Sequence, residues 1–290
     1  QKNRLLTAGA YSFGYDFEGQ LSTGYSATYT FDYEHRLKTI GSSYQFSYDG
    51  SGNRVQAVRS GVTTRYIYDA RGNLLAEADG NNNITKYFIH GMGLMAMVTD
   101  TGNVYTYHFN AVGSTVAMTD SGQNVVNKYS YDPFGKVVNQ VEAVAQPFKF
   151  IGQHGVMTEP NGFYYMRARY YDPELGRFIS EDPIGFEGGD VNLCAYAGNN
   201  PVNRIDPLGL IEIPHAGTGF PTIDPGNSGG GGIPSNPLPD PFFKQLFDYV
   251  RIHHITIWDL LPKTNIPSET PINKAPGTPQ STTYGCHPNK

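Results

Sequence analysis

Short segments in which polar and apolar residues alternate recur along the first 210 residues, and most end in an aromatic residue followed by Asp. The segment TTRYIYD at 63–69 is one of them, and its period of two predicts a strand with one buried face. Asp69 and Gly72 then supply side-chain hydrogen bonding and a positive φ for a turn, after which NLLAEA returns as the partner strand. Each such unit is therefore predicted to form one β-hairpin.

The unit is repeated with the same residue types in the same order. In the first four copies the aromatic residues before Asp stand 16, 17 and 20 residues apart, which suits one hairpin per unit. The copies are YDFEGQL (15–21), FDYEHRL (31–37), YDGSGNRV (48–55), YDARGNLL (68–75), FNAVGSTV (109–116) and YDPFGKVV (131–138). An ordinary sandwich with accidental similarity is the alternative, and the agreement in both type and order argues against it.

The composition agrees with an all-β chain. Its 290 residues include 21 Tyr, 34 Gly and 20 Pro, a mixture typical of strands joined by many turns. A buried tyrosine can hide its ring while its hydroxyl finds a partner. The net charge of −5 gives no basic field for nucleic acid. The chain has no run of 18 apolar residues, so no membrane-spanning helix is predicted. It starts at Gln1 without Met, which predicts that it is a piece of a longer protein.

The composition changes near residue 210. The first 210 residues hold 19 of the 21 tyrosines and 7 of the 20 prolines, whereas the last 80 hold 2 tyrosines and 13 prolines. This change predicts a domain boundary. The two cysteines, Cys194 and Cys286, are too few for a disulfide framework; two free thiols are favoured over a single bridge between them.

The stretch RARYYDPELGRFISEDPIGFEGGDVNLCAYAGNNPVNRIDPLGL at 167–210 resembles the Rhs repeat-associated core almost throughout. Together with the Tyr-Asp units, it makes about residues 10–210 similar to Rhs/YD-repeat proteins, toxin-complex C subunits and teneurins. Cys194 departs from the pattern, because the family more often has an aromatic residue there, and this leaves the local packing open.

The resemblance implies a mainly β fold in which antiparallel YD-repeat hairpins form part of a spiralling β-sheet shell. Residues 1–150 would be shell, residues 151–210 a core-associated plug with a self-cleavage motif, and residues 211–290 a variable, mostly irregular C-terminal passenger. About 210 residues of repeat are too few to enclose a cavity, so we expect the last turns of a larger shell.

Two similar turns, DPIGF at 182–186 and DPLGL at 206–210, stand close to the boundary. Each fits a type I turn with Asp first, Pro second and Gly fourth, and on local sequence alone a structural turn is the favoured interpretation. The alternative is a pair of carboxylates that share one proton, as in an aspartic protease. The turn residues after the two aspartates are Pro183, Gly185, Pro207 and Gly209.

The resemblance favours the catalytic interpretation. It implies that the chain cuts itself after the leucine of DPLGL, between Leu210 and Ile211. Asp182 and Asp206 would be the catalytic pair and Arg177 would assist, by holding a carboxylate ionised or by steadying the oxyanion. The alternative for Arg177 is a surface ion pair with Glu174 or Glu181. Asp190 is interpreted as a turn residue, and no cofactor or metal is implied.

The segment after the boundary carries little recognisable chemistry. Residues 211–240 hold 7 Gly and 6 Pro and are predicted to be a linker, residues 241–261 a short helix or strand, and residues 262–290 a disordered tail. The residues His253, His254, Asp259, Cys286 and His287 lack metal-ligand spacing. An enzymatic toxin in 211–290 is therefore not supported by the sequence.

The predicted function is an Rhs-type shell that encapsulates a C-terminal passenger or toxin and releases it by aspartyl-type self-cleavage. The alternative is a structural or adhesive YD-repeat cell-surface protein without cleavage activity. The partners implied are the chain's own C-terminal segment held in the shell, an immunity protein, and secretion-apparatus or delivery proteins. No nucleic acid is expected for the shell, and the family implies a secreted or cell-surface bacterial location.

Overall fold

The computed structural model describes residues 3–91 and 93–214, which lie in one compact unit. The predicted element at 241–261, the tail at 262–290 and all but the first four residues of the predicted linker lie outside the described residues. The same is true of His253, His254, Asp259, Cys286 and His287.

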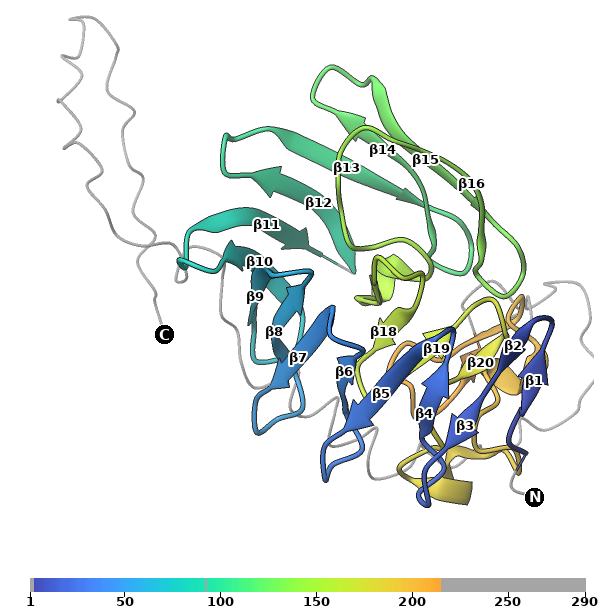
Figure 1. The fold of residues 1–290 in the computed structure, drawn as a ribbon. Coiled ribbons are helices and arrows are strands. Elements are labelled where there is room, and N and C mark those ends of the chain that lie inside the picture. Colours follow the sequence, from blue (N-terminus) through green and yellow to red (C-terminus); the bar gives the residue numbers. More distant parts are fainter. Residues whose placement is uncertain (1–2, 92, 215–290) are drawn as a thin grey trace, which may run out of the picture. The chain divides into compact units, whose positions relative to one another are not determined.

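A 14-stranded antiparallel sheet dominates the described residues. Each strand pairs with the next one along the chain, from β3 to β16, so that the sheet is one long meander (Figure 1). This confirms the predicted fold class. The strands are β3 (Gly14–Tyr15), β4 (Leu21–Gly24), β5 (Ala27–Phe31), β6 (Leu37–Ile40), β7 (Tyr44–Tyr48), β8 (Arg54–Arg59), β9 (Val62–Tyr68), β10 (Leu74–Asp79), β11 (Ile84–His90), β12 (Leu94–Thr99), β13 (Val104–Phe109), β14 (Thr115–Asp120), β15 (Val125–Tyr131) and β16 (Val137–Glu142). Before them, β1 (Thr7–Ala8) and β2 (Tyr11–Ser12) form a separate antiparallel pair.

The turns follow the chemistry expected from the repeated unit. Asp69 accepts hydrogen bonds from the backbone N–H groups of Arg71 and Asn73, both at 2.8 Å, and Gly72 adopts a φ of +77°. In the unit at 31–37, His35 stands at the glycine position and adopts a φ of 63°, a conformation that L residues rarely take. The turn is therefore kept even where its preferred residue is missing.

In three of the Tyr-Asp pairs the tyrosine ties its strand to the preceding one. The register shifts beside it, for example between Ser47 and Tyr48, and such a bulge turns the side chain away from the regular alternation. Its hydroxyl then donates to a carbonyl of the neighbouring strand. The bonds are Tyr48 to Leu37 at 2.6 Å, Tyr68 to Arg54 at 3.0 Å and Tyr131 to Thr115 at 2.7 Å.

Residues 151–214, here called the inner segment, pack against one face of the sheet. Figure 1 shows β18 within the curve of the sheet, and Tyr165 and Tyr170 share a buried cluster with Phe46 and Tyr66 of the sheet. The segment consists of a four-stranded antiparallel sheet, three 3-10 turns and a small hairpin. Its elements are η1 (Gly152–His154), β17 (Met157–Thr158), β18 (Tyr164–Met166), β19 (Arg169–Asp172), β20 (Arg177–Phe178), η2 (Gly185–Gly188), η3 (Ala197–Asn199), β21 (Arg204–Ile205) and β22 (Ile213–Pro214).

A buried ion network joins the sheet to the inner segment. Arg54 of β8 and Glu159 of the inner segment are both fully buried and form an ion pair. Arg59 binds the same carboxylate at 2.7 Å, and Arg54 also donates to the hydroxyl of Tyr170 at 2.8 Å. A buried charge is tolerated only when it is paired, so this network fixes which part of the sheet the inner segment meets.

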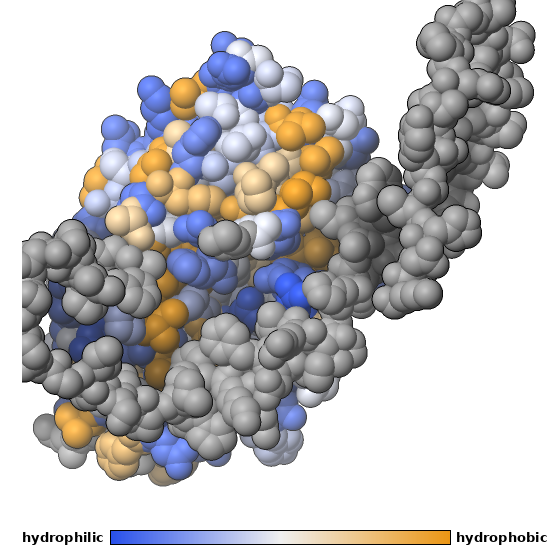
Figure 2. All heavy atoms as spheres, turned by 180° about the vertical axis from the view of Figure 1, so that it is seen from behind, coloured by the Kyte–Doolittle hydropathy of each residue, from blue (hydrophilic) through white to orange (hydrophobic). Residues whose placement is uncertain are grey.

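The surface carries scattered apolar side chains. Figure 2 shows apolar and polar residues interspersed on the face that it presents, and Val62, Met95 and Val125 are among the exposed apolar residues. Scattered exposure of this kind is normal for a folded protein. Within residues 3–91 and 93–214, no helix has both the length and the apolar character needed to cross a membrane.

Candidate functional site

Both predicted Asp-Pro turns form in the inner segment. At the first, the carbonyl of Asp182 accepts a hydrogen bond from the N–H of Gly185 at 2.9 Å, and its Oδ1 accepts one from the N–H of Ile184 at 3.0 Å. At the second, the carbonyl of Asp206 accepts from the N–H of Gly209 at 3.4 Å. The two aspartates thus play the turn role that local sequence favours, which leaves their outer carboxylate oxygens, Oδ2, directed elsewhere.

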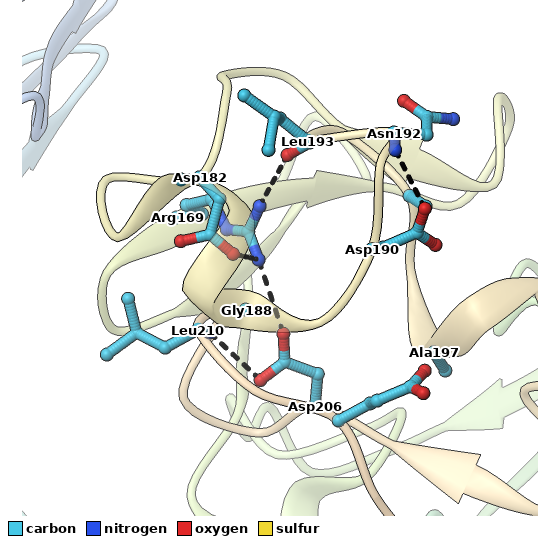
Figure 3. Close-up of a pocket in the computed structure, with 12 residues that line it drawn as sticks. Arg169, Asp182, Gly188, Asp190, Asn192, Leu193, Ala197, Asp206 and Leu210 are labelled. Carbon is cyan, nitrogen blue, oxygen red and sulfur yellow. Dashed lines mark hydrogen bonds and ion pairs between the residues drawn. The ribbon is translucent and has the colours of Figure 1, made fainter.

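These oxygens meet at a small cavity of about 20 Å³, which is room for roughly one water molecule. Figure 3 shows that the aspartates approach it from two separate loops. The lining residues include Arg169, Asp182, Gly188, Asp190, Asp206, Leu210 and Glu212. The two aspartates, 24 residues apart in the sequence, are therefore close together in the fold and next to the bond predicted to be cut.

Arg169 lies between the two carboxylates and binds both of them (Figure 3). Its Nη2 is 2.8 Å from Oδ2 of Asp182 and 3.4 Å from Oδ2 of Asp206. A single guanidinium thus connects the first Asp-Pro turn to the second.

Other contacts fix the position of this guanidinium. Nε donates to the carbonyl of Gly209 at 2.5 Å, and Nη1 donates to the carbonyl of Leu193 at 2.8 Å. The group also lies over the ring of Phe178, 3.7 Å from its centroid. Arg169 begins β19, in a run of buried residues, and its side chain is only 3% exposed. The strand therefore delivers a buried cation to the cavity.

The electrostatics of the site favour one shared proton. Burial raises the pKa of Asp182 and that of Asp206, and Arg169 acts in the opposite direction on both. Burial also lowers the pKa of Arg169. Two ionised carboxylates beside one guanidinium would leave a net negative charge in a poorly hydrated place. A single proton removes that charge, and this is the ionisation state that aspartyl-type chemistry needs.

The Leu210–Ile211 peptide bond meets both aspartates, one at the carbonyl of Leu210 and the other at the N–H of Ile211. A Cβ placed on Gly188 would lie 2.7 Å from Oδ2 of Asp182 and 2.9 Å from the carbonyl oxygen of Leu210, so these two oxygens share the space that the glycine leaves open. On the other side, Asp206 accepts from the N–H of Leu210 at 3.0 Å, and the N–H of Ile211 helps to lower its pKa. Asp182 thus lies by the carbonyl and Asp206 by the amide nitrogens.

The structure brings Arg169, rather than the predicted Arg177, to the aspartates. Arg177 is not among the cavity-lining residues; its Nη2 donates to the carbonyl of Asn3 at 2.8 Å, and its guanidinium lies beside the thiol of Cys194. Arg169 reaches the two aspartates because β19 begins at the cavity, whereas β20 directs Arg177 toward the first residues of the chain.

The partners suggested for Arg177 have other bonds. Glu174 pairs with Lys136 at 2.7 Å and Glu181 pairs with Arg4 at 3.5 Å. Asp190 accepts from the N–H of Asn192 at 2.7 Å, as a turn residue does, although it also lines the cavity.

Cys194 is a buried free thiol, and burial raises its pKa; its predicted alternative partner, Cys286, lies outside the described residues. In the described part of the chain, no three His, Cys, Asp or Glu side chains are arranged to hold a metal ion.

Sequence and structure comparisons give a consistent set of similar proteins. The sequence model for the teneurin YD-shell matches residues 1–202. The tRNA nuclease WapA of Bacillus subtilis (strain 168) is 36% identical over 236 residues, which is 77% of this chain and 10% of WapA. Toxin protein Tse5 of Pseudomonas aeruginosa is 46% identical over 80 residues, which is 28% of this chain and 6% of Tse5.

Solved structures share the fold. The Tc holotoxin pore of Photorhabdus luminescens aligns with a TM-score of 0.57 and 20% identity, over 69% of this chain and 11% of the aligned chain. A crystal structure of TcdB2-TccC3-TEV aligns with a TM-score of 0.55 and 20% identity, over 68% of this chain and 11% of that one. The chain thus spans about a tenth of the length of WapA and of these toxin chains.

Proposed function

The chain belongs to the teneurin YD-shell family, and on this basis we propose that it is part of a β-shell that carries residues 211–290 as its passenger and cuts the Leu210–Ile211 bond once, by aspartyl-type hydrolysis. The proposal includes roles for three side chains. Asp182 and Asp206 are the catalytic pair, and Arg169 takes the assisting part that the family resemblance implied for Arg177.

One observation carries the proposal. Asp182 and Asp206 are bound to a single buried guanidinium at a water-sized cavity, and the carbonyl oxygen of Leu210 lies in the same space as Oδ2 of Asp182. Two turns with purely structural roles would have no reason to share a buried arginine. Nor would they need to enclose the one peptide bond that stands at the compositional boundary.

The proposed reaction is hydrolysis by one water molecule. The ionised carboxylate of the pair takes a proton from the water, whose oxygen attacks the carbonyl carbon of Leu210. Asp182, which lies by the carbonyl oxygen, donates the shared proton to it as the tetrahedral intermediate forms. When the C–N bond breaks, Asp206 supplies a proton to the nitrogen of Ile211. As the intermediate collapses, one of its hydroxyl groups returns a proton to Asp182, which restores the shared proton. The products are a carboxylate on Leu210 and a protonated amine on Ile211.

Arg169 contributes charge and position. Its guanidinium keeps one of the two carboxylates ionised in a buried place, so that a base is present. Its Nε–H bond to the carbonyl of Gly209 also holds the residue before Leu210. A bond held this firmly reacts with the benefit of intramolecular orientation, which reaches effective molarities of about 10⁵ M or more. Because each chain is cut only once, rate enhancement from orientation of this size is sufficient for the proposed reaction.

The passenger is proposed to be a toxin. The support is sequence similarity to two kinds of protein: WapA proteins, which are named as tRNA nucleases, and Tse5, which is named as a toxin. A shell that carries a toxin also calls for delivery proteins, and for an immunity protein in the producing cell. We propose a secreted or cell-surface location for the same reason.

Intact mass spectrometry of the purified protein beside its Asp206→Asn variant tests the proposal. The expected result is a wild-type fragment that ends at Leu210 together with one that begins at Ile211, and a variant that stays in one piece. Asp190→Asn is the matched control, because Asp190 lines the same cavity but binds only a turn N–H in the bonds described. An uncut wild-type chain, or equal cleavage of the wild type and Asp206→Asn, overturns the proposal.

A further inference from the structure

The Leu210–Ile211 bond lies in the loop of a β-hairpin. Strand β21 pairs antiparallel with β22, with Arg204 opposite Pro214 and Ile205 opposite Ile213. The Asp206 turn and the predicted cleavage site fill the seven-residue connection between these strands, residues 206–212. The chain after the bond therefore turns back and is held beside the chain before it.

Two side chains after the bond are anchored separately. Ile213 packs against the buried cluster that contains Ile205, which is 1% exposed. Glu212 forms an ion pair with Arg204, and its carboxylate lies against Gly198, since a Cβ on that glycine would be 2.9 Å from Oε2. Neither anchor belongs to the catalytic groups proposed above.

We infer that this hairpin clasp, formed by β21, β22 and the Arg204–Glu212 pair, positions the C-terminal side of the bond for cleavage, and that Arg204 and Glu212 are positioning residues for the proposed reaction. The inference rests on the proposed self-cleavage. Arg169 and Asp206 hold the chain up to the N–H of Ile211, but the direction in which the chain leaves the bond is set by the residues beyond it. The clasp supplies the second hold, at the second and third residues beyond the bond.

The clasp also selects the sequence that can follow the bond. An acidic residue in second place meets Arg204, and an apolar residue in third place meets the cluster around Ile205. Any passenger attached at this point is therefore expected to begin with a short leader of this chemistry, whatever its own activity.

Charge reversal tests the inference. The whole protein is made by cell-free translation, samples are quenched at timed intervals, and the fragment that ends at Leu210 is quantified by mass spectrometry. Arg204→Glu and Glu212→Arg are each expected to slow cleavage about two- to fivefold or more, the range of an exposed ion pair. The double variant, Arg204→Glu with Glu212→Arg, is expected to restore the wild-type rate. Ile213→Ser tests the apolar anchor and is also expected to slow cleavage.

The control is Lys136→Glu. Lys136 is 46% exposed and pairs with Glu174, much as the 48% exposed Arg204 pairs with Glu212. Lys136 is not among the residues that line the cavity, and its reversal is expected to leave the rate unchanged. Equal rates for the wild type and both single reversals, or a double variant no faster than the singles, overturn the clasp while self-cleavage stands. If the wild type is as uncut as Asp206→Asn, the proposed function fails and the clasp fails with it.

Discussion

Oδ1 of Asp206 accepts a hydrogen bond from the backbone N–H of Leu210 at 3.0 Å. The candidate catalytic carboxylate is thus hydrogen-bonded to Leu210, the residue that precedes the peptide bond it is proposed to help cleave. This bond leaves Oδ2 of the same carboxylate for Arg169, 3.4 Å away. One side chain thereby forms the turn that presents the bond and also contributes to the charge of the site.

The first prediction distinguishes the two arginines. Arg169→Gln should slow cleavage by at least about 100-fold, because it removes the only cation that contacts both carboxylates within the described residues. Arg177→Gln should cleave at nearly the wild-type rate, because its guanidinium binds a carbonyl near the start of the chain. Timed gel analysis of both variants gives the rates, with thermal melting to show that each is folded. The reverse order of effects would return the assisting role to Arg177.

The second prediction concerns the space in front of Gly188. Gly188→Ala should slow cleavage by about 100-fold, because the added methyl group would push either Asp182 or the Leu210 carbonyl out of place, and misplacement of about 1 Å has effects of that size. Gly50→Ala is the control, since a Cβ there meets nothing within 4 Å. Like Gly188, Gly50 lacks the positive φ that would strain an alanine. Equal cleavage of the two variants would contradict the proposed placement of the bond.

The third prediction is the pH dependence of cleavage. The rate should rise and fall around a maximum at acidic pH, because the reaction needs one ionised and one protonated carboxyl. Burial raises the pKa of both groups above the ordinary value of 3.8, so the shared proton is lost only at a pH above the usual titration range of Asp. Rates measured from strongly acidic to mildly alkaline buffers give the profile. A rate that climbs steadily into the alkaline range would exclude a carboxyl pair as the acid and base.

The fourth prediction concerns stability. Glu159→Gln should lower the free energy of unfolding by about 3–5 kcal/mol, since it leaves the fully buried Arg54 without its counter-charge. Glu174→Gln is the control, because the exposed pair of Glu174 with Lys136 should contribute little to stability. Denaturant titration measures both. Similar losses in the two variants would mean that burial does not set the strength of these pairs.

The same network should make the fold sensitive to acid. Burial alone would raise the pKa of Glu159, but Arg54 and Arg59 outweigh it and the pKa is lowered. A lowered carboxyl pKa stabilises the folded state above the pKa of the unfolded chain, and this contribution is lost as the pH falls through the folded pKa. The wild type should therefore lose stability below about pH 4.5, the ordinary value for Glu, and Glu159→Gln should lose less over the same range.

Local patterns predicted the repeated hairpins because the whole signal lies within a few residues. The alternation of 63–69, the side-chain bonds of Asp69 and the positive φ of Gly72 are all encoded where they act, and they appear in β9, β10 and the turn between them. Even His35 follows the unit, although its residue type does not predict its φ of 63°.

The site was harder to predict because it depends on contacts between distant residues. The two aspartates could be named from their turns, but Arg169 stands in the run YYMRARYY, which looks like an ordinary strand. A signal was present, since a cation at a buried position of such a run requires a buried partner. The hairpin of β21 and β22 carried a weaker sequence signal, because strands of two residues are too short to show a hydrophobic periodicity.

The size of the cavity limits what the site can act upon. About 20 Å³ of space, bordered by the protein's own Leu210, admits a water molecule but no polypeptide from outside. The groups proposed to be catalytic would therefore be carried through a cell without risk to its other proteins, and a chain that has already been cut should not process a peptide offered to it in trans. Selectivity of this kind comes from exclusion, since the proposed reaction uses a peptide bond that the protein's own fold places beside the carboxylates.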